Sequence, residues 1–321
     1  GLKAQTAADE AIASLKRGEK PIIAVENTMG SFLSEYASSN GLAQGDSLGS
    51  FDYRTVLSRA LERSRALVET LPTGEEVRKT ISLAQLDPVT RKAYDQAQEV
   101  IDGLKISIPV SPIDWMRAEI ERAGFSVAEI TGRNLAVDYS NKGKPVLSAI
   151  EQAEQRDKVA TTRRFNGGEL DALILNVAGS TGISLHASEK FQDQRQRHMI
   201  VAQAAGDINI FMQMLGRIHR TGQVRLPKYT ILSVDLPTEK RPTAVLSRKM
   251  KSLNANTSSN TESATSVKTA DILNKYGDQI VNQYLVDNLA LANQLDVDDL
   301  LSSDGERVTD DIARKATGRL A

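Results

Sequence analysis

Several hydrogen-bond donors stand close together in FMQMLGRIHRTGQVRLPKY, residues 211–229. Gln213, Arg217 and Arg220 stand there in a Q-x-x-G-R-x-x-R pattern, just before a strand-like run. If the segment is helical, a spacing of three brings both guanidinium groups onto one face. Guanidinium groups match phosphate oxygens, and phosphoryl transfer depends mostly on positioning and electrostatic stabilisation. The pattern therefore predicts an arginine pair aimed at one phosphate, with Gln213 seating the segment.

The alternative for these residues is a solvated basic helix face. The apolar run MQML beside the arginines counts against it, and so does Gly216, a poor choice in a plain surface helix. We interpret His219 as a structural residue. His186 and His198 are interpreted as satisfied or surface histidines.

Further small and polar residues follow strand-like runs, at the places where a parallel sheet ends. They occur in ENTMGS (26–31), ITGR (130–133) and AGSTGIS (178–184). Open α/β sheets bind ligands at the carboxyl edge of their strands, where backbone amides and hydroxyl groups are exposed. The alternative for each stretch is an ordinary tight turn. In ITGR, Arg133 is then a structural residue.

Five short apolar runs separated by helical patterns define the elements that must position these residues. Their lack of alternation is typical of strands buried on both faces, so we expect a parallel α/β sheet. A helix is predicted from Pro112, with Ser111 as its cap and Asp114 completing a capping-box-like spacing. The runs cover residues 21–27, 127–131, 171–177, 198–203 and 229–235.

Two regions depart from the α/β alternation. Residues from about 41 to 104 read as a helical insertion, in which TVLSRALERSRALVETL is one expected helix. After Leu253 a polar stretch predicts a linker, followed by a helical tail that ends in acidic residues. We therefore expect one α/β unit over residues 1–252 and an extension over residues 253–321.

Composition narrows the possible functions. Lys and Arg number 40 against 41 Asp and Glu, so an anionic partner must be met by a local patch. The chain has no cysteine, which excludes disulfides, thiolate metal sites and thiol catalysis. No apolar run is long enough to span a membrane, and a cytoplasmic protein is expected. Gly1 in place of Met suggests a processed product or a piece of a longer protein.

A nucleotide-binding α/β domain normally carries G-x-x-x-x-G-K-[ST], whose amides and Lys hold the phosphates. That motif is absent from this chain. Neither Asp235 nor the pair Asp298 and Asp299 stands where a magnesium-binding carboxylate is expected, and no residue is predicted as a metal ligand.

Taken in order, ITGR, then RRFNGGELDALILNVAGSTGISLHAS, then QMLGRIHRTGQ resemble the second RecA-like lobe of superfamily 2 helicases. The closer resemblance is to the C-terminal helicase domain of the strawberry-notch family. It rests on AGSTGISLHA, GRIHRTGQVRLPKY, EKRPTAVLSRKMKSLNANT and NKYG. It extends over most of residues 1–285, weakly across the insertion. The resemblance implies a RecA-like sheet flanked by helices.

The resemblance also implies roles for individual residues. Arg217 and Arg220 match the arginines of motif VI, which act as arginine fingers on ATP. Nucleotide contacts are implied for Gly182, Ser184 and Gly216. Contacts to a nucleic-acid backbone are implied for Thr28, Gly30, Ser31, Thr131, Arg133, Ser180 and Thr181.

As implied partners, the resemblance gives ATP with Mg²⁺, bound mainly by a first RecA-like lobe in the same longer polypeptide, and nucleic acid, with DNA favoured over RNA. The function expected is an ATP-dependent helicase or translocase. The alternative is a non-catalytic scaffold of helicase fold in a phage particle or an anti-restriction assembly; such a protein would be phage-encoded and virion-associated. Intact Arg217 and Arg220 favour the motor.

Overall fold

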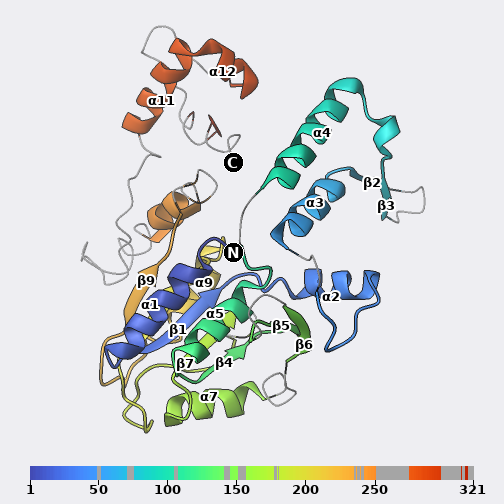
Figure 1. Cartoon of the computed structure of the whole chain (residues 1–321). Helices are drawn as coiled ribbons and strands as arrows, with labels where there is room; N and C mark the ends of the chain where they lie inside the picture. Colours follow the sequence, from blue (N-terminus) through green and yellow to red (C-terminus); the bar gives the residue numbers. More distant parts are fainter. Residues whose placement is uncertain are drawn as a thin grey trace.

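A five-stranded parallel sheet forms the centre of the computed structural model (Figure 1). Its strands lie in the order β4-β7-β1-β8-β9. Their bounds are β1 Lys20–Val25, β4 Val127–Ile130, β7 Ala172–Asn176, β8 Arg197–Val201 and β9 Lys228–Ile231. The structure describes residues 1–48, 52–70, 76–104, 108–140, 145–150, 157–176, 179, 181–234, 236, 239, 242–250, 275–297, 312 and 315–316.

All five apolar runs predicted as strands are strands of this sheet, and the α/β expectation is confirmed. Every residue of β1, β7 and β8 is buried, including Lys20 and Arg197 at the start of β1 and β8. The central strand β1 pairs with β7 through Ile22 and Leu173 and with β8 through Ile22 and Met199.

Helices cover both faces of the sheet. On one face, α1 Ala4–Lys16 and α5 Pro112–Arg122 pack against residues such as Ile23 and Ile174. On the other, α7 Lys158–Gly167 and α9 Ile208–Leu215 pack through Phe165 and Phe211 against Ile22 and its neighbours. Alternate residues of each strand therefore enter two separate cores.

The helix from Pro112 is confirmed with Ser111 at its N-cap, but the predicted side-chain cap is not made. The Ser111 side chain makes no capping bond to α5. Its hydroxyl group instead donates to Oδ2 of Asp114 at 2.5 Å, and Asp114 is held by an ion pair described below. The spacing that resembled a capping box thus belongs to a buried polar cluster.

The insertion is not wholly helical. It contains α3 Tyr53–Arg63, the antiparallel strands β2 Ala66–Thr70 and β3 Glu76–Thr80, the short 3-10 helix η1 Leu83–Gln85, and α4 Pro88–Gly103. The helix expected across TVLSRALERSRALVETL was wrong beyond Arg63, because Leu67 and its neighbours pair with β3. Figure 1 shows these elements standing apart from the sheet.

Contacts between charged and aromatic side chains join α3 to α2 Gly30–Ser39, the helix that follows β1. The Arg59 guanidinium lies 5.1 Å from the ring centre of Tyr36 and 5.8 Å from that of Phe32. Glu35 on α2 pairs with Arg59 and Arg63. No residue of α3 or α4 is buried, and Val56 of α3 adds a partly buried apolar contact with the cluster of Leu33 and Ala37.

Beyond the sheet, β5 Leu135–Asp138 and β6 Val146–Ala149 form a small antiparallel pair. Near the C-terminus, α11 Lys275–Asp287 and α12 Leu289–Gln294 form a separate apolar cluster that includes Leu285 and Ala292. The division at residues 252 and 253 stays a prediction. None of the helices that the structure describes combines the length and apolarity needed to span a bilayer.

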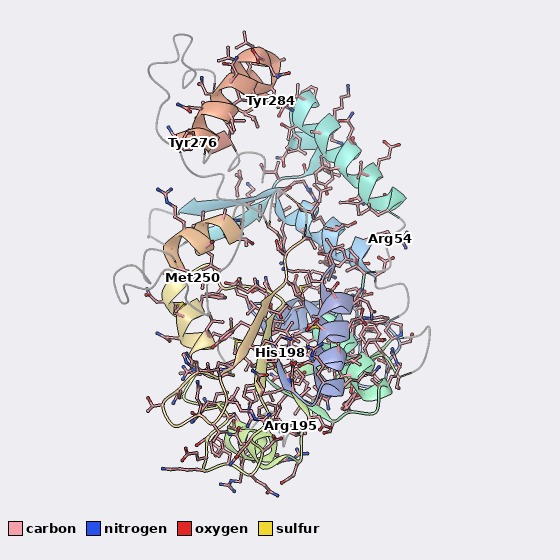
Figure 2. All side chains as sticks on the ribbon, turned by 90° about the vertical axis from the view of Figure 1, so that its left-hand side faces the viewer. Arg54, Arg195, His198, Met250, Tyr276 and Tyr284 are labelled. Atoms are coloured by element: carbon pink, nitrogen blue, oxygen red, sulfur yellow. The ribbon has the colours of Figure 1, made fainter. Side chains whose placement is uncertain are left out.

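His198 lies in the interior between α1 and β9 (Figure 2). Its Nδ1 is 2.9 Å from Oγ of Ser14, and its Nε2 is 2.8 Å from Oγ1 of Thr230. Burial, aided by the charge of Lys228, lowers the pKa of His198 to about 4. It is a satisfied core histidine, as interpreted from the sequence.

This shift makes stability depend on pH. Between pH 6.5 and about 4, the unfolded chain protonates His198 and the folded protein does not, so the free energy of unfolding should fall by about 3 kcal/mol. His198→Gln should remove that part of the slope. Urea denaturation of both proteins at pH 7.5, 5.5 and 4.5 measures it, and equal slopes would contradict the assignment. The pKa of Glu19 is also lowered, to about 2, so its protonation at low pH reduces the free energy of unfolding of the parent and of His198→Gln alike.

Candidate nucleotide and nucleic-acid site

The two arginines of the Q-x-x-G-R-x-x-R pattern lie beyond a helix and not on it. Helix α9 carries Gln213, which is exposed, and ends at Leu215 with Gly216 as its C-cap. Residues 216–223, called the arginine loop below, continue in turns. The expectation that Arg217 and Arg220 share a helical face is therefore wrong.

The loop nevertheless brings both arginines to one point. Nη1 of Arg217 lies 3.5 Å from the carbonyl oxygen of Ile183, and Nη2 of Arg220 lies 3.3 Å from the same oxygen. Among the described residues neither arginine forms an ion pair, and Nε of Arg217 is buried without a hydrogen-bond partner. Burial and the charge of Arg220 lower the pKa of Arg217. Two close cations with unused donors make this point a candidate anion site.

Backbone hydrogen bonds fasten the arginine loop to the segment after β7. The amide of Leu185 donates to the carbonyl of Arg217 at 2.9 Å, and the amide of Val224 donates to that of Ala187 at 2.8 Å. Nε of Arg197 donates to the carbonyl of Leu185 at 2.9 Å. Leu185 is thus held from both sides, and its position sets that of Arg217.

Arg197 belongs to a buried ionic cluster that the sequence did not reveal. Its guanidinium contacts the carboxylate of Asp193 at 3.5 Å, which also pairs with Lys20 and Arg195. Burial alone would raise the pKa of Asp193, but hydrogen bonds from Arg195 and Lys20 hold it well below its usual range. Lys20 is the first residue of β1 and Arg197 the first residue of β8. In the sequence, a charged residue at the start of an apolar run indicates only a strand boundary, so it does not predict a buried ionic cluster.

The glycine turn, residues 181–184, supplies the Ile183 carbonyl. Gly182 has φ +79°, which favours glycine, and Thr181 is exposed. Asn166 of α7 donates to the carbonyl of Ser184, whose hydroxyl group lies 3.2 Å from Nδ1 of His186. The predicted nucleotide contacts Gly182 and Ser184 are therefore beside the arginine pair. Ser180 lies outside the described residues.

A second set of predicted residues surrounds the N-terminus of α2. Thr28 accepts a hydrogen bond from the amide of Gly30 at 3.3 Å, and Ser31 is exposed in the first turn. Both line a cavity of about 550 Å³ at the carboxyl ends of β1, β7 and β8, with Asn176 and Gln203. Packing also favours a glycine at position 30, because a methyl group there would lie 2.7 Å from Cβ of Arg133.

Arg133 is buried and does not reach this cavity as a free cation. Its side chain, 1% exposed, pairs with Asp114 and Glu129 at 2.5 Å each. Although burial favours the neutral form, these hydrogen bonds raise the pKa of Arg133. Thr131 likewise donates to Glu129 at 2.7 Å. The phosphate contact expected of Arg133 is therefore wrong in this structure, since its donors serve carboxylates.

The residues present suit a phosphate better than a metal ion. Arg217 and Arg220 supply donors without an anion, whereas no group of three or more His, Cys, Asp or Glu within the described part of the chain is placed to hold a metal.

Known proteins resemble this chain in sequence. It is 26% identical to "Protein strawberry notch homolog 2" of Homo sapiens over 70% of this chain and 17% of that protein. It is 29% identical to "Protein strawberry notch" of Drosophila melanogaster, over 56% of this chain and 11% of that protein. It is 32% identical to "Protein strawberry notch homolog 2" of Mus musculus, over 58% of this chain and 14% of that protein. The chain thus spans less than a fifth of these relatives.

Among solved structures, the C-terminal part of the Fun30 ATPase domain is 10% identical over 72% of this chain and 81% of that one, with a TM-score of 0.28. That value is too low to carry an argument. Residues 119–310 match the helicase family model described as "C-terminal domain on Strawberry notch homologue". This match includes the glycine turn, the arginine loop and most of the sheet. The chain therefore belongs to the family of helicase C-terminal domains found on Strawberry notch homologues.

Proposed function

We propose that this chain is the second lobe of an ATP-dependent nucleic-acid helicase or translocase. Arg217 and Arg220 act as its arginine fingers, and Gln213 supports the segment from α9. The observation that carries the proposal is the convergence of two guanidinium groups on the Ile183 carbonyl without an ion pair among the described residues. Isolated surface arginines have no reason to approach each other in this way, because their charges repel.

ATP with Mg²⁺ supplies the phosphoryl group that such arginines stabilise. In this chain the arginine loop contacts the phosphates, and the glycine turn with Gly182 and Ser184 lies beside them. A first RecA-like lobe contributes the phosphate-binding loop and the metal ligands. The phosphate backbone of a nucleic acid, with DNA favoured over RNA, contacts Thr28, Ser31 and Thr181. Because these contacts are to phosphates, the affinity for nucleic acid should fall as the salt concentration rises.

The proposal predicts that neither lobe works alone. The 321-residue chain should show no nucleic-acid-stimulated ATP hydrolysis above background, because it lacks a phosphate loop. A polypeptide that joins it to a first lobe, here called the complete motor, should hydrolyse ATP when single-stranded DNA is added. Steady-state phosphate release, with and without DNA, measures the ATP hydrolysis of the chain alone and of the complete motor. Turnover by the chain alone that is lost on mutating it would refute the half-motor assignment.

A further inference from the structure

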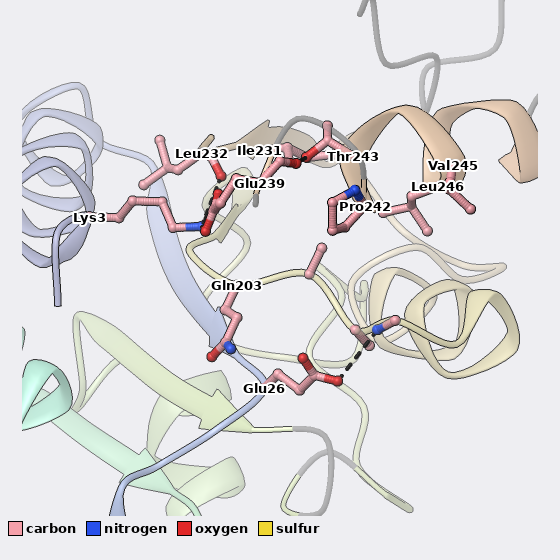
Figure 3. A pocket seen from close by; sticks show the side chains of 13 residues that line it. Lys3, Glu26, Gln203, Ile231, Leu232, Glu239, Pro242, Thr243, Val245 and Leu246 are labelled. Atoms are coloured by element: carbon pink, nitrogen blue, oxygen red, sulfur yellow. Dashed lines mark hydrogen bonds and ion pairs between the residues drawn. The ribbon is translucent and has the colours of Figure 1, made fainter. Parts of the chain in front are cut away.

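The cavity at the junction of β1, β8 and β9 has no role in the mechanism above (Figure 3). Its volume is about 490 Å³, which falls within the ~300–1,000 Å³ of small-molecule sites. The walls are mostly apolar and include Ala204, Ile231, Val245 and Leu246. Glu26, the first residue after β1, and Gln203, two residues after β8, add polar groups.

The sheet topology marks this place as a ligand crevice. After β1 the chain returns to β4 through α5 on one face of the sheet, whereas after β8 it enters α9 on the opposite face. Since β1 and β8 are neighbours, their connections diverge at the carboxyl edge. In open α/β sheets ligands bind at such a switch point.

Two polar side chains in this crevice have unused hydrogen-bonding capacity. One carboxylate oxygen of Glu26 accepts a long bond of 3.4 Å from the amide of Gly206, and no cation among the described residues pairs with Glu26. Oε1 of Gln203 accepts from the amide of Asn27 at 3.1 Å, which leaves its NH₂ group without a protein partner in the described part of the chain. Figure 3 shows the two side chains next to each other.

The charge of the lining residues determines which chemical groups can bind in the crevice. Lys3 pairs with Glu239 at 2.6 Å, so these two charges cancel, and Glu26 gives the described lining of the crevice a net negative charge. A phosphate is repelled there. A flat neutral ring that offers N–H groups to the carboxylate and an acceptor to the amide fits both the apolar walls and the polar pair. A Lys or Arg side chain from a protein partner would leave the Gln203 donors unused.

We propose that this crevice receives one nucleobase of a bound single strand and prefers guanine. Guanine presents two adjacent N–H groups, N1 and N2, to one carboxylate, and its O6 to the Gln203 amide. Thymine and uracil place a carbonyl oxygen on each side of their single N–H, so one carbonyl oxygen faces Glu26. The crevice shares Glu26 and Gln203 with the cavity of Thr28 and Ser31, so a backbone held there can send a base inward.

This inference deepens the proposed nucleic-acid role and rests on it, and it contradicts a purely sequence-independent track. Its test uses the 321-residue chain and labelled twelve-nucleotide dT strands with one central dG, dI, dA or dC. Fluorescence anisotropy at low salt should show dG binding about tenfold tighter than all-dT, since a good bidentate base contact is worth ~1–3 kcal/mol. The dI strand, which lacks the N2 donor, should fall between them.

Glu26→Gln keeps the shape of the side chain and removes one acceptor and the charge. We expect the preference for dG to fall below about twofold, while all-dT affinity stays or rises. Glu169→Gln removes an equal charge from the exposed end of α7 and should keep the full preference. Equal affinity for all strands, or a Glu26→Gln effect that is the same for every strand, would overturn the proposal.

Free guanosine separates this inference from the nucleic-acid function. Titration of guanosine, with thymidine as its control, into the chain followed by NMR reports the crevice without any backbone contact. Saturable guanosine binding that Glu26→Gln abolishes supports the crevice even if no oligonucleotide binds, in which case the nucleic-acid role fails alone. Oligonucleotide binding without base preference and without guanosine binding rejects the crevice and leaves the track intact.

Discussion

Arg220→Ala in the complete motor is expected to lower DNA-stimulated ATP hydrolysis by about 10³- to 10⁵-fold, the range that an arginine finger contributes to turnover. This corresponds to about 4 to 7 kcal/mol of transition-state stabilisation, whereas an exposed ion pair contributes about 0 to 1 kcal/mol. Arg220→Lys should restore little, because an ammonium group cannot reproduce the planar fork. Steady-state ATPase with saturating single-stranded DNA measures the effect, and thermal unfolding should be unchanged.

Arg225→Ala is the matched control, since it removes the same charge from an exposed position five residues on. It should stay within a few-fold of the parent, as should DNA affinity without nucleotide in Arg220→Ala. Near-parental turnover in Arg220→Ala, or a loss that follows unfolding, would assign the arginine pair a structural role. The non-catalytic scaffold would then be the better description of the protein.

Arg133→Met is expected to cost about 3–5 kcal/mol of unfolding free energy, because it leaves Asp114 and Glu129 as buried carboxylates without their cation. Urea denaturation followed by circular dichroism measures this loss. Arg164 of α7 pairs with Glu169 at the surface, so Arg164→Met should lower the free energy of unfolding by less than about 1 kcal/mol. If Arg133→Met unfolds within 1 kcal/mol of the parent, the guanidinium is not held as described and a phosphate contact regains support.

Much of the sheet could be predicted because its information is local. Strands such as β1 and β7 are uninterrupted apolar runs bounded by turn residues, and such runs are typical of parallel strands buried on both faces. The hairpin of β2 and β3 was missed because RALVET continues a helical periodicity, and only the pairing of Leu67 with Lys79 across the hairpin makes it a strand. Tertiary pairing outweighs propensity there.

Sequence patterns point to the residues of the candidate site but not to their contacts. Arg217 and Arg220 were found from their spacing, yet the shared partner Ile183 lies more than thirty residues earlier and leaves no mark in the motif. Arg133 was misassigned because a free and a buried arginine look alike in sequence. Glu26 and Gln203 were missed because they meet only when β1 and β8 become neighbours.

The central place of β1 also has a consequence for biosynthesis. Its partner in β7 follows about 150 residues later, and its partner in β8 later still. At about 5–20 residues per second, the apolar strand emerges from the ribosome roughly 8–30 s before it can pair. Over that interval, α1 with its alanine face and later α5 are the described elements that can pack on it. We therefore expect nascent chains that end before Ala172 to be strong clients of chaperones that bind apolar segments.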